Sequence, residues 1–93
     1  MIELEQYFKG QENWLKFSEM FGNDWVNSEF QMKLLSEVEN QIDIAKVIYY
    51  HIGNGSLNWL NQKVPALDNL TPTECLKSER LTNRLKECLM RMQ

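Results

Sequence analysis

Residues 71–92, TPTECLKSERLTNRLKECLMRM, decide the fold class of this chain. Thr71 and Glu74 have the spacing of a capping box, in which each side chain accepts the other residue's backbone N–H. Pro72 occupies the first helical position, where its missing N–H costs nothing. Ser78 then opens a longer helix with an apolar stripe at helical spacing, formed by Leu81, Leu85, Cys88, Leu89 and Met92. The stretch predicts a short capped helix followed by a long amphipathic one.

The segment before this stretch also favours helices. Residues 1–64 contain no proline, and no part of them alternates apolar and polar residues as a half-buried strand does. A short turn is expected over residues 2–8. A helix is expected over residues 12–21, followed by Gly22 as a left-handed C-cap.

The next helical signal begins at Ser28, whose hydroxyl and the side chain of Gln31 can form a second capping box. From there, apolar residues keep the 3.6-residue period over residues 30–49. One long helix and two stacked helices fit this pattern equally well. A break would fall at the polar residues 39–41.

A turn at residues 53–55 ends this run, and Asn54 or Ser56 is expected to cap a short helix that carries Trp59. Residues 62–70 form a turn-rich connection. The chain therefore reads as an all-α protein, one small helical domain of about five or six helices. An acidic, aromatic-rich segment (residues 1–41) and a C-terminal region (residues 42–93) are expected to pack together.

Length and composition narrow the class of protein. Ninety-three residues, 43% of them hydrophobic and 25% charged, are typical of one globular domain with a modest core. No apolar run approaches the roughly 18 residues of a membrane span, and the N-terminus lacks the basic-then-apolar order of a signal peptide. We expect a soluble, cytoplasmic protein without a membrane partner.

The residues that carry metal and redox chemistry are few and scattered. Cys75 and Cys88 have no CxxC partner, and the single histidine, His51, precedes Cys75 by 24 positions. Tetrahedral metal sites require three or four such ligands at close spacing. With no export signal, the cysteines are expected to be reduced thiols. The sequence predicts no metal site and no cofactor.

Catalytic motifs are missing as well. His51 follows two tyrosines and is expected to be a partly buried or helix-terminal residue rather than a base. Glu37 and Glu39 stand two positions apart and point to different faces of a helix. Residues 53–55, Gly-Asn-Gly, are too short for a phosphate-binding loop. No residue set supplies a nucleophile, a base and a charge stabiliser, so we do not expect an enzyme.

Charge is distributed unevenly along the chain. Residues 1–43 hold three Lys against nine Asp or Glu, a charge of −6, while residues 44–93 hold seven Lys or Arg against four Asp or Glu, a charge of +3. The two halves could therefore face different partners. Because DNA binding depends on basic residues that neutralise phosphates, the acidic first half argues against specific nucleic-acid binding.

The second half carries a recognisable series of motifs. Residues 53–61 (GNGSLNWLN), 65–72 (PALDNLTP) and 74–76 (ECL) precede the leucine-spaced helix that runs to Met92. Together they resemble the toxin-binding domain of the MbcA/ParS/Xre antitoxin family over residues 42–92. The glycine that the family usually has before Thr-Pro is replaced by Asn69-Leu70. This departure requires Asn69 to adopt a left-handed conformation, which asparagine does more readily than most residues.

The resemblance implies a small helical antitoxin that binds a RES-domain toxin, an enzyme that consumes NAD, and covers its active site. Two alternatives stay open. One is a stand-alone oligomerisation or adaptor module of the same fold without a toxin partner. The other is a transcriptional regulator whose first half hides a degenerate helix-turn-helix.

Candidate partner-binding residues are those that interfaces favour. Trp59 is either a packing residue or a hot spot, and the charged residues of the last helix either form a solvated face or meet an acidic or NAD-binding surface. The set is Trp59, Arg80, Arg84, Glu87 and Arg91. The core is expected to contain Leu60, Leu67, Leu76, Leu85 and Leu89. Seven aromatic residues between Tyr7 and Phe30 are also expected in the core, and any excess would leave an apolar patch for dimerisation or docking.

Overall fold

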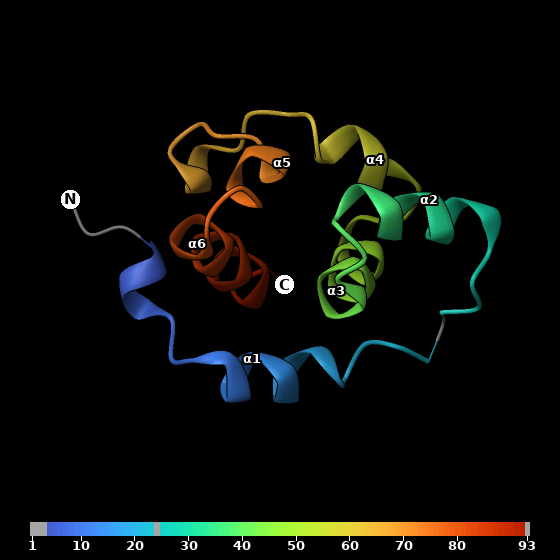
Figure 1. The fold of residues 1–93 in the computed structure, drawn as a ribbon, viewed down its shortest axis with the longest axis horizontal. Helices are drawn as coiled ribbons and strands as arrows, with labels where there is room; N and C mark the ends of the chain where they lie inside the picture. The colour runs from blue at the N-terminus through green and yellow to red at the C-terminus, as the bar shows by residue number, and fades with distance from the viewer. Residues whose placement is uncertain (1–3, 24, 93) are drawn as a thin grey trace.

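The last long helix, α6 (Glu79–Met90), packs against elements from both halves of the chain and lies between α5 and α1 (Figure 1). A computed structural model describes residues 4–23 and 25–92. In it, α6 contacts a 3-10 turn at the N-terminus, the turn before α5, and helices α1, α3 and α5. Because neighbouring elements of the chain pack against α6 from several sides, every residue from Arg84 to Leu89 is buried.

The remaining elements are short. The helices are α1 (Gln11–Ser18), α2 (Glu29–Glu37), α3 (Ile42–Ile52), α4 (Ser56–Trp59) and α5 (Pro72–Cys75), and the 3-10 turns are η1 (Leu4–Tyr7), η2 (Gly53–Gly55) and η3 (Pro65–Leu67). Extended pairing in the described residues is limited to one isolated bridge between Val64 and Leu70. The radius of gyration is 12.4 Å, close to the roughly 12 Å of a folded domain of this length. The all-α, single-domain prediction is confirmed.

Helix starts follow the predicted capping chemistry. The Thr71 hydroxyl accepts the N–H of Glu74 at 3.1 Å, the Glu74 carboxylate accepts the N–H of Thr71 at 2.8 Å, and Pro72 stands at the first helical position. Ser28 and Gln31 form the second capping box at α2. The Ser78 hydroxyl accepts the N–H of Leu81 and opens α6.

One expected cap is wrong. Asn54 does not cap α4, because residues 53–55 form the turn η2, and Gly55 occupies the N-cap position without a side-chain bond. The Ser56 hydroxyl instead donates to the carbonyl of Gly53 at 2.6 Å. The chain therefore enters α4 directly from a 3-10 turn.

The apolar run over residues 30–49 is divided between two helices. The break falls at residues 39–41, where Glu39 and Asn40 have φ angles of 59° and 60°. Two consecutive left-handed residues end α2 and turn the chain into α3. Gly22 behaves differently from the expectation, because α1 ends at Ser18 and the φ of Gly22 is not positive.

The core joins both halves of the chain. The five leucines assigned to it from the sequence are all buried. Trp14 of α1 is fully buried as well, and its indole Nε1 donates to the carboxylate of Asp43 on α3 at 2.6 Å. The N-terminal helices thus pack on the C-terminal region rather than extend away from it (Figure 1).

The other N-terminal aromatic residues surround this core. Phe8, Phe17, Phe21, Trp25 and Phe30 are half-buried, whereas Tyr7 is 46% exposed. Phe21 packs at 4.5 Å from the ring of Tyr50 and at 5.3 Å from that of His51. His51 is half-buried near the end of α3, with its Nδ1 at 2.9 Å from the carbonyl of Val47. No helix in the described part of the chain has the length and apolarity needed to span a bilayer.

Candidate functional site

The arginine face of α6, defined here as Arg80, Arg84, Glu87 and Arg91, contains four of the five residues predicted to bind a partner. Their spacing of four, three and four residues places them on one side of the helix. The turn η1 packs along α6. The acidic N-terminal segment therefore covers part of the face that the sequence offered to another protein.

Two members of this face are buried, although both interpretations of the sequence, a solvated face and a partner contact, placed them at the surface. Arg84 is 4% exposed and Glu87 is 8% exposed, as is their neighbour Lys86 at 6%. The amphipathic pattern of α6 implied one solvent-exposed side, but η1 and α1 both pack against α6 on the side of its charged residues. Arg84 and Glu87 are thus structural residues in the folded chain, and Arg80 and Arg91 form the exposed margin of the face.

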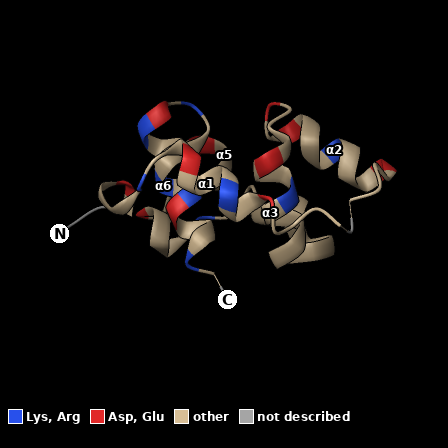
Figure 2. Cartoon of the chain, turned by 90° about the horizontal axis from the view of Figure 1, so that it is seen from below, with Lys and Arg blue, Asp and Glu red and all other residues tan. Residues whose placement is uncertain are grey.

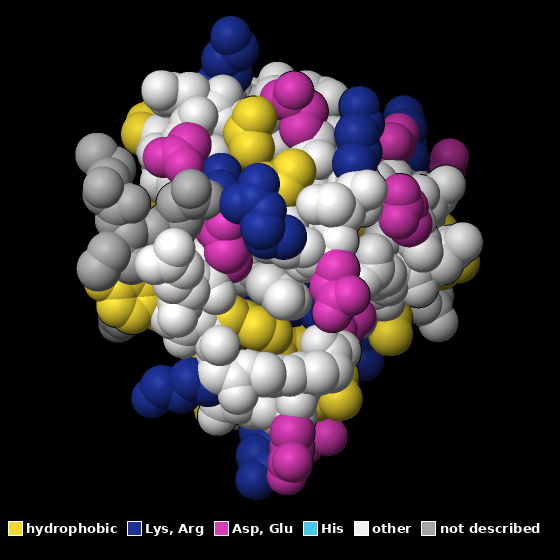
Figure 3. All heavy atoms as spheres, turned by 60° about the vertical axis from the view of Figure 1, so that its left-hand side comes forward, with side chains coloured by type: hydrophobic (Ala, Val, Ile, Leu, Met, Phe, Trp, Pro, Cys, Tyr) yellow, Lys and Arg dark blue, Asp and Glu magenta, His cyan; other side chains and the backbone are white. Residues whose placement is uncertain are grey.

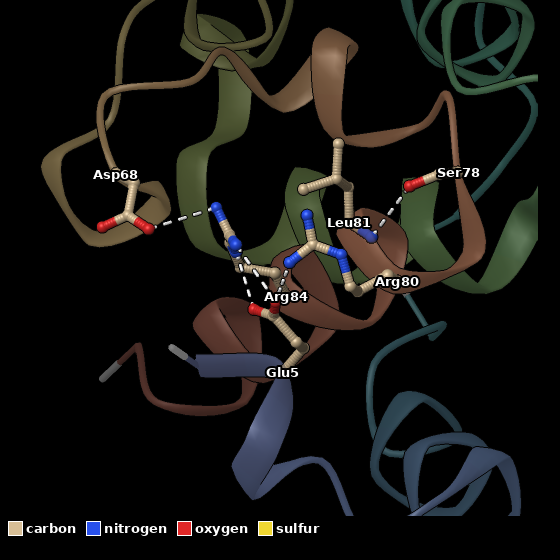
Figure 4. A network of polar contacts seen from close by, with 6 residues as sticks. All are labelled: Glu5, Asp68, Ser78, Arg80, Leu81 and Arg84. Carbon is tan, nitrogen blue, oxygen red and sulfur yellow. Dashed lines mark hydrogen bonds and ion pairs between the residues drawn. The ribbon is translucent and has the colours of Figure 1, made fainter. Parts of the chain in front are cut away.

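The carboxylate of Glu5 holds two arginines (Figure 4). Arg84 donates from Nε to Oε1 at 2.7 Å and from Nη2 to Oε2 at 3.0 Å, while Arg80 donates from Nη1 to the same Oε2. The Glu5 and Arg84 side chains are only 9% and 5% exposed. A two-pronged arginine–carboxylate pair that is shielded from water is among the stronger polar contacts in proteins.

Arg84 also reaches the turn that precedes α5. Its Nη1 lies 3.2 Å from Oδ2 of Asp68. Asp68 and Asn69 have φ angles of 59° and 65°, so the left-handed conformation predicted for Asn69 is present and begins one residue earlier. This backbone path allows Arg84 to connect η1, α6 and the loop after η3 (Figure 4).

The margin of the arginine face is exposed and ordered by local contacts. The Arg80 side chain is 62% exposed and that of Arg91 is 51% exposed. Arg91 donates from Nε to Glu87 at 2.7 Å, and its guanidinium lies 4.8 Å from the ring centre of Tyr7. Figure 3 shows basic, acidic and apolar side chains next to one another on the face of the molecule that carries η1.

Trp59 does not belong to the arginine face. It is half-buried on α4, which packs against α2 and α3, and it contacts the core with part of its ring. A different surface feature lies near the start of α4, where Phe21, Trp25, Tyr49 and Tyr50 line an aromatic groove of about 350 Å³. The sequence signal for this groove was the excess of rings in the first 30 residues.

Glu5 and Asp68 were missed by sequence reasoning. The available signal for Glu5 was the charge difference between the halves, which the structure resolves partly by pairing Glu5 of the acidic first half with arginines of the basic second half. Asp68 lies in the second half, so this signal did not apply to it. Acidic and basic residues accordingly lie close together around α1 and α6 (Figure 2). Which carboxylate meets which arginine depends on tertiary packing and has no local pattern.

Both cysteines are buried and unpaired. Burial raises the pKa of the Cys75 thiol to about 11 and also raises the pKa of the Cys88 thiol. Thiols in such surroundings stay protonated and are poor nucleophiles and metal ligands. Within residues 4–23 and 25–92, no three His, Cys, Asp or Glu side chains gather in a way that could hold a metal ion.

Comparisons with known proteins leave the family open. The chain matches no protein-family model, no curated protein and no solved structure. The antitoxin resemblance therefore stays a prediction from the motifs of residues 42–92.

Proposed function

We propose that this chain is an antitoxin-like domain that binds a RES-type, NAD-consuming toxin and covers the toxin's active site. The observation that carries the proposal is the exposed margin of the arginine face, where Arg80 and Arg91 lie on either side of the buried stretch of α6. The mechanism is steric, so it needs no reactive group on this chain.

Preorganisation supports this margin as a binding surface. Arginine normally loses side-chain entropy when it forms a contact, and a side chain that is already oriented loses less. Glu5 orients Arg80, and Glu87 together with Tyr7 orients Arg91. Guanidinium groups held in this way suit carboxylates or phosphates on a partner.

The packing of residues 42–92 supports a rigid scaffold behind the margin. The carbonyl of Leu60 accepts both the N–H and the hydroxyl of Thr73, which ties α4 to α5. The Thr82 hydroxyl donates to the carbonyl of Cys75 and ties α6 to α5. A surface that does not rearrange can cover a pocket without an ordering cost.

The experiment is co-expression with the product of the adjacent gene, or with a RES-domain toxin, followed by growth rescue and calorimetry. We expect a stoichiometric complex. Arg80→Glu and Arg91→Glu should each weaken it at least tenfold, about 1.4 kcal/mol. Arg84 is not substituted in this experiment, because the loss of its buried contacts would destabilise the fold.

Lys33→Glu is the matched control, since it makes the same charge change at an exposed position on α2. Its affinity should equal that of the original chain, and circular dichroism should show equal helicity for all variants. Absence of a complex would reject the antitoxin function. Equal affinity of the Arg80 and Arg91 variants would remove the arginine face from the interface.

Self-association is the second candidate, and one observation favours it. Among the residues that the structure describes, seven large apolar side chains are more than a third exposed, namely Tyr7, Leu15, Met20, Val26, Met32, Ile42 and Tyr50. Apolar residues left outside a small core often serve contacts between subunits. Light scattering after size-exclusion chromatography separates the candidates, because an adaptor module would be a dimer or larger without any toxin.

A further inference from the structure

A second pocket lies where the segment before α1 meets α6. Its volume is about 500 Å³, and its lining includes Phe8, Gln11, Gln41, Glu79, Asn83 and Lys86. Pockets of roughly 300 to 1,000 Å³ are the usual size for small-ligand sites. No member of the arginine face is in this lining.

Lys86 supplies an unusual charge to this pocket. Lys86 is only 6% exposed, and its ammonium donates to Oε1 of Gln11 at 2.7 Å. It lies 5.9 Å from the ring centre of Phe8 and 5.7 Å from that of Trp14. Among the described residues no carboxylate lies within ion-pair distance of Lys86, although almost all buried lysines have such a partner.

The charged groups around Lys86 act at longer range. Burial lowers the pKa of Lys86, and the carboxylates of Asp43 and Glu79 oppose this change by favouring the ammonium form. Asp43 is already engaged as the acceptor of the Trp14 indole N–H. Glu79 is exposed and lines the pocket, so water screens its repulsion of an anion bound there. The ammonium is therefore stabilised by aromatic faces and one amide, without a direct counter-ion.

The other polar groups in the lining are amides. Because Oε1 of Gln11 accepts from Lys86, the NH₂ of the same side chain is a donor, and Asn83 and Gln41 carry further NH₂ groups. One cation with amide donors around it is complementary to a carboxylate, which accepts through two oxygens.

We propose that this pocket, the Lys86 pocket, binds a carboxylate group that pairs with the Lys86 ammonium and accepts hydrogen bonds from the amides of Gln11 and Asn83. The carboxylate can come from a free dicarboxylic acid or from an Asp or Glu side chain of a protein. The chemistry is the same in both cases. The pocket is separate from the arginine face, so the proposal does not depend on the antitoxin function.

The test measures binding of two carboxylate probes to the full chain by two-dimensional NMR at constant ionic strength. One probe is succinate, and neutral succinamide is its uncharged control. The other is a capped peptide with a single Glu, and the same peptide with Gln in place of Glu is its uncharged control. We expect at least one acidic probe to shift the side-chain amide signals of Gln11 and Asn83, and its uncharged control to leave them unchanged.

Lys86→Met is the decisive variant, because methionine keeps the length and the ring contacts while it removes the charge. A buried ammonium without an ion-pair partner carries a desolvation cost that an apolar side chain of similar size does not, so this variant should remain folded. Its affinity for the acidic probe should fall at least tenfold, whereas Lys77→Met, at an exposed position, should leave it unchanged.

The acidic probe that binds with the higher affinity shows whether the pocket prefers a free acid or a carboxylate side chain of a protein. If neither acidic probe shifts the Gln11 and Asn83 signals, or if Lys86→Met binds as tightly as the original chain, the proposal is overturned. If Lys86→Met unfolds, Lys86→Gln with the same probes gives the same decision, because it retains hydrogen bonding and lacks the charge.

Discussion

Glu5 and Arg84 are 79 positions apart in the sequence, yet Oε1 of Glu5 accepts from Nε of Arg84 at 2.7 Å. The pair attaches the N-terminal turn to the central helix. Both side chains are largely shielded from water, so each charge is compensated mainly by the other rather than by solvent. This contact is therefore a determinant of stability as well as of the shape of the arginine face.

Glu5→Gln should lower the free energy of unfolding by about 3 kcal/mol, because it removes the carboxylate charge that faces the buried guanidinium of Arg84. Urea unfolding followed by circular dichroism measures the change. Glu12→Gln is the control, since Glu12 is 89% exposed and pairs with Lys16 at 3.8 Å. That surface pair should contribute less than about 1 kcal/mol. Equal losses in the two variants would show that the Glu5 contact is not a buried ion pair.

Thr71→Ala removes the cap of α5 and should cost about 1 kcal/mol. The threonine hydroxyl accepts the N–H of Glu74, and no other group of residue 71 can replace it. Thermal unfolding is the measurement, with Thr73→Ser as a control that keeps the hydroxyl bond to Leu60. A Thr71→Ala protein as stable as the original would contradict the capping box.

The same box predicts a pH dependence. The backbone N–H and then the side chain of Thr71 lower the pKa of Glu74 from its ordinary value of 4.5. Because the folded-state pKa is below the unfolded one, the ionised carboxylate stabilises the fold above about pH 4.5, and this contribution disappears as the pH falls through the folded pKa. Glu74→Gln should therefore be less stable than the original chain near neutral pH and equal to it in acid. A stability difference that is independent of pH would argue against the lowered pKa.

Glu39→Gly should stabilise the protein by about 0.5 to 1 kcal/mol. Glu39 has a left-handed φ of 59°, a conformation that is strained for a residue with a Cβ and unstrained for glycine. Relief of this strain should outweigh the larger conformational entropy that glycine loses on folding. Chemical denaturation measures the gain. Asn40→Gly should gain less, because asparagine tolerates the left-handed region better than glutamate does. A loss of stability in Glu39→Gly would mean that its side chain makes a contact that outweighs the backbone cost.

The two thiols should be inert in the folded protein. Burial places the Cys75 pKa at about 11, so almost no thiolate exists at about pH 8, where disulfide reagents are normally used. The rate of labelling should equal the rate of unfolding and should rise sharply in denaturing urea. Fast labelling of both thiols without denaturant would contradict their burial.

Local chemistry made much of this fold predictable. The boxes at Ser28 and at Thr71 and the N-cap at Ser78 each depend on neighbours within three residues, and the sequence displays those neighbours directly. The left-handed Asn69 was expected from the antitoxin resemblance, because it replaces a glycine that the family usually has. The buried leucines followed from helical periodicity. Asn54 was mispredicted because a glycine-rich turn offered two competing ways to begin α4, and the 3-10 turn prevailed.

The arrangement around α6 was beyond the reach of sequence patterns. A helical wheel identifies a charged side, but it cannot tell that Glu5 and Asp68 from distant segments will cover it. Arg84, Lys86 and Glu87 therefore seemed solvated and are buried. The partner-binding roles of Trp59, Arg80, Arg84, Glu87 and Arg91 stay predictions, and burial makes Arg84 and Glu87 the least accessible of the five.

The long separation between Glu5 and Arg84 also has a consequence for biosynthesis. A ribosome that adds about 5 to 20 residues per second needs roughly 4 to 16 s to travel from one residue to the other. During that interval the emerging acidic segment has no α6 to pack against, so its aromatic side chains are open to chaperones and to other nascent chains. The domain is therefore expected to acquire its final shape only after its last helix has left the exit tunnel.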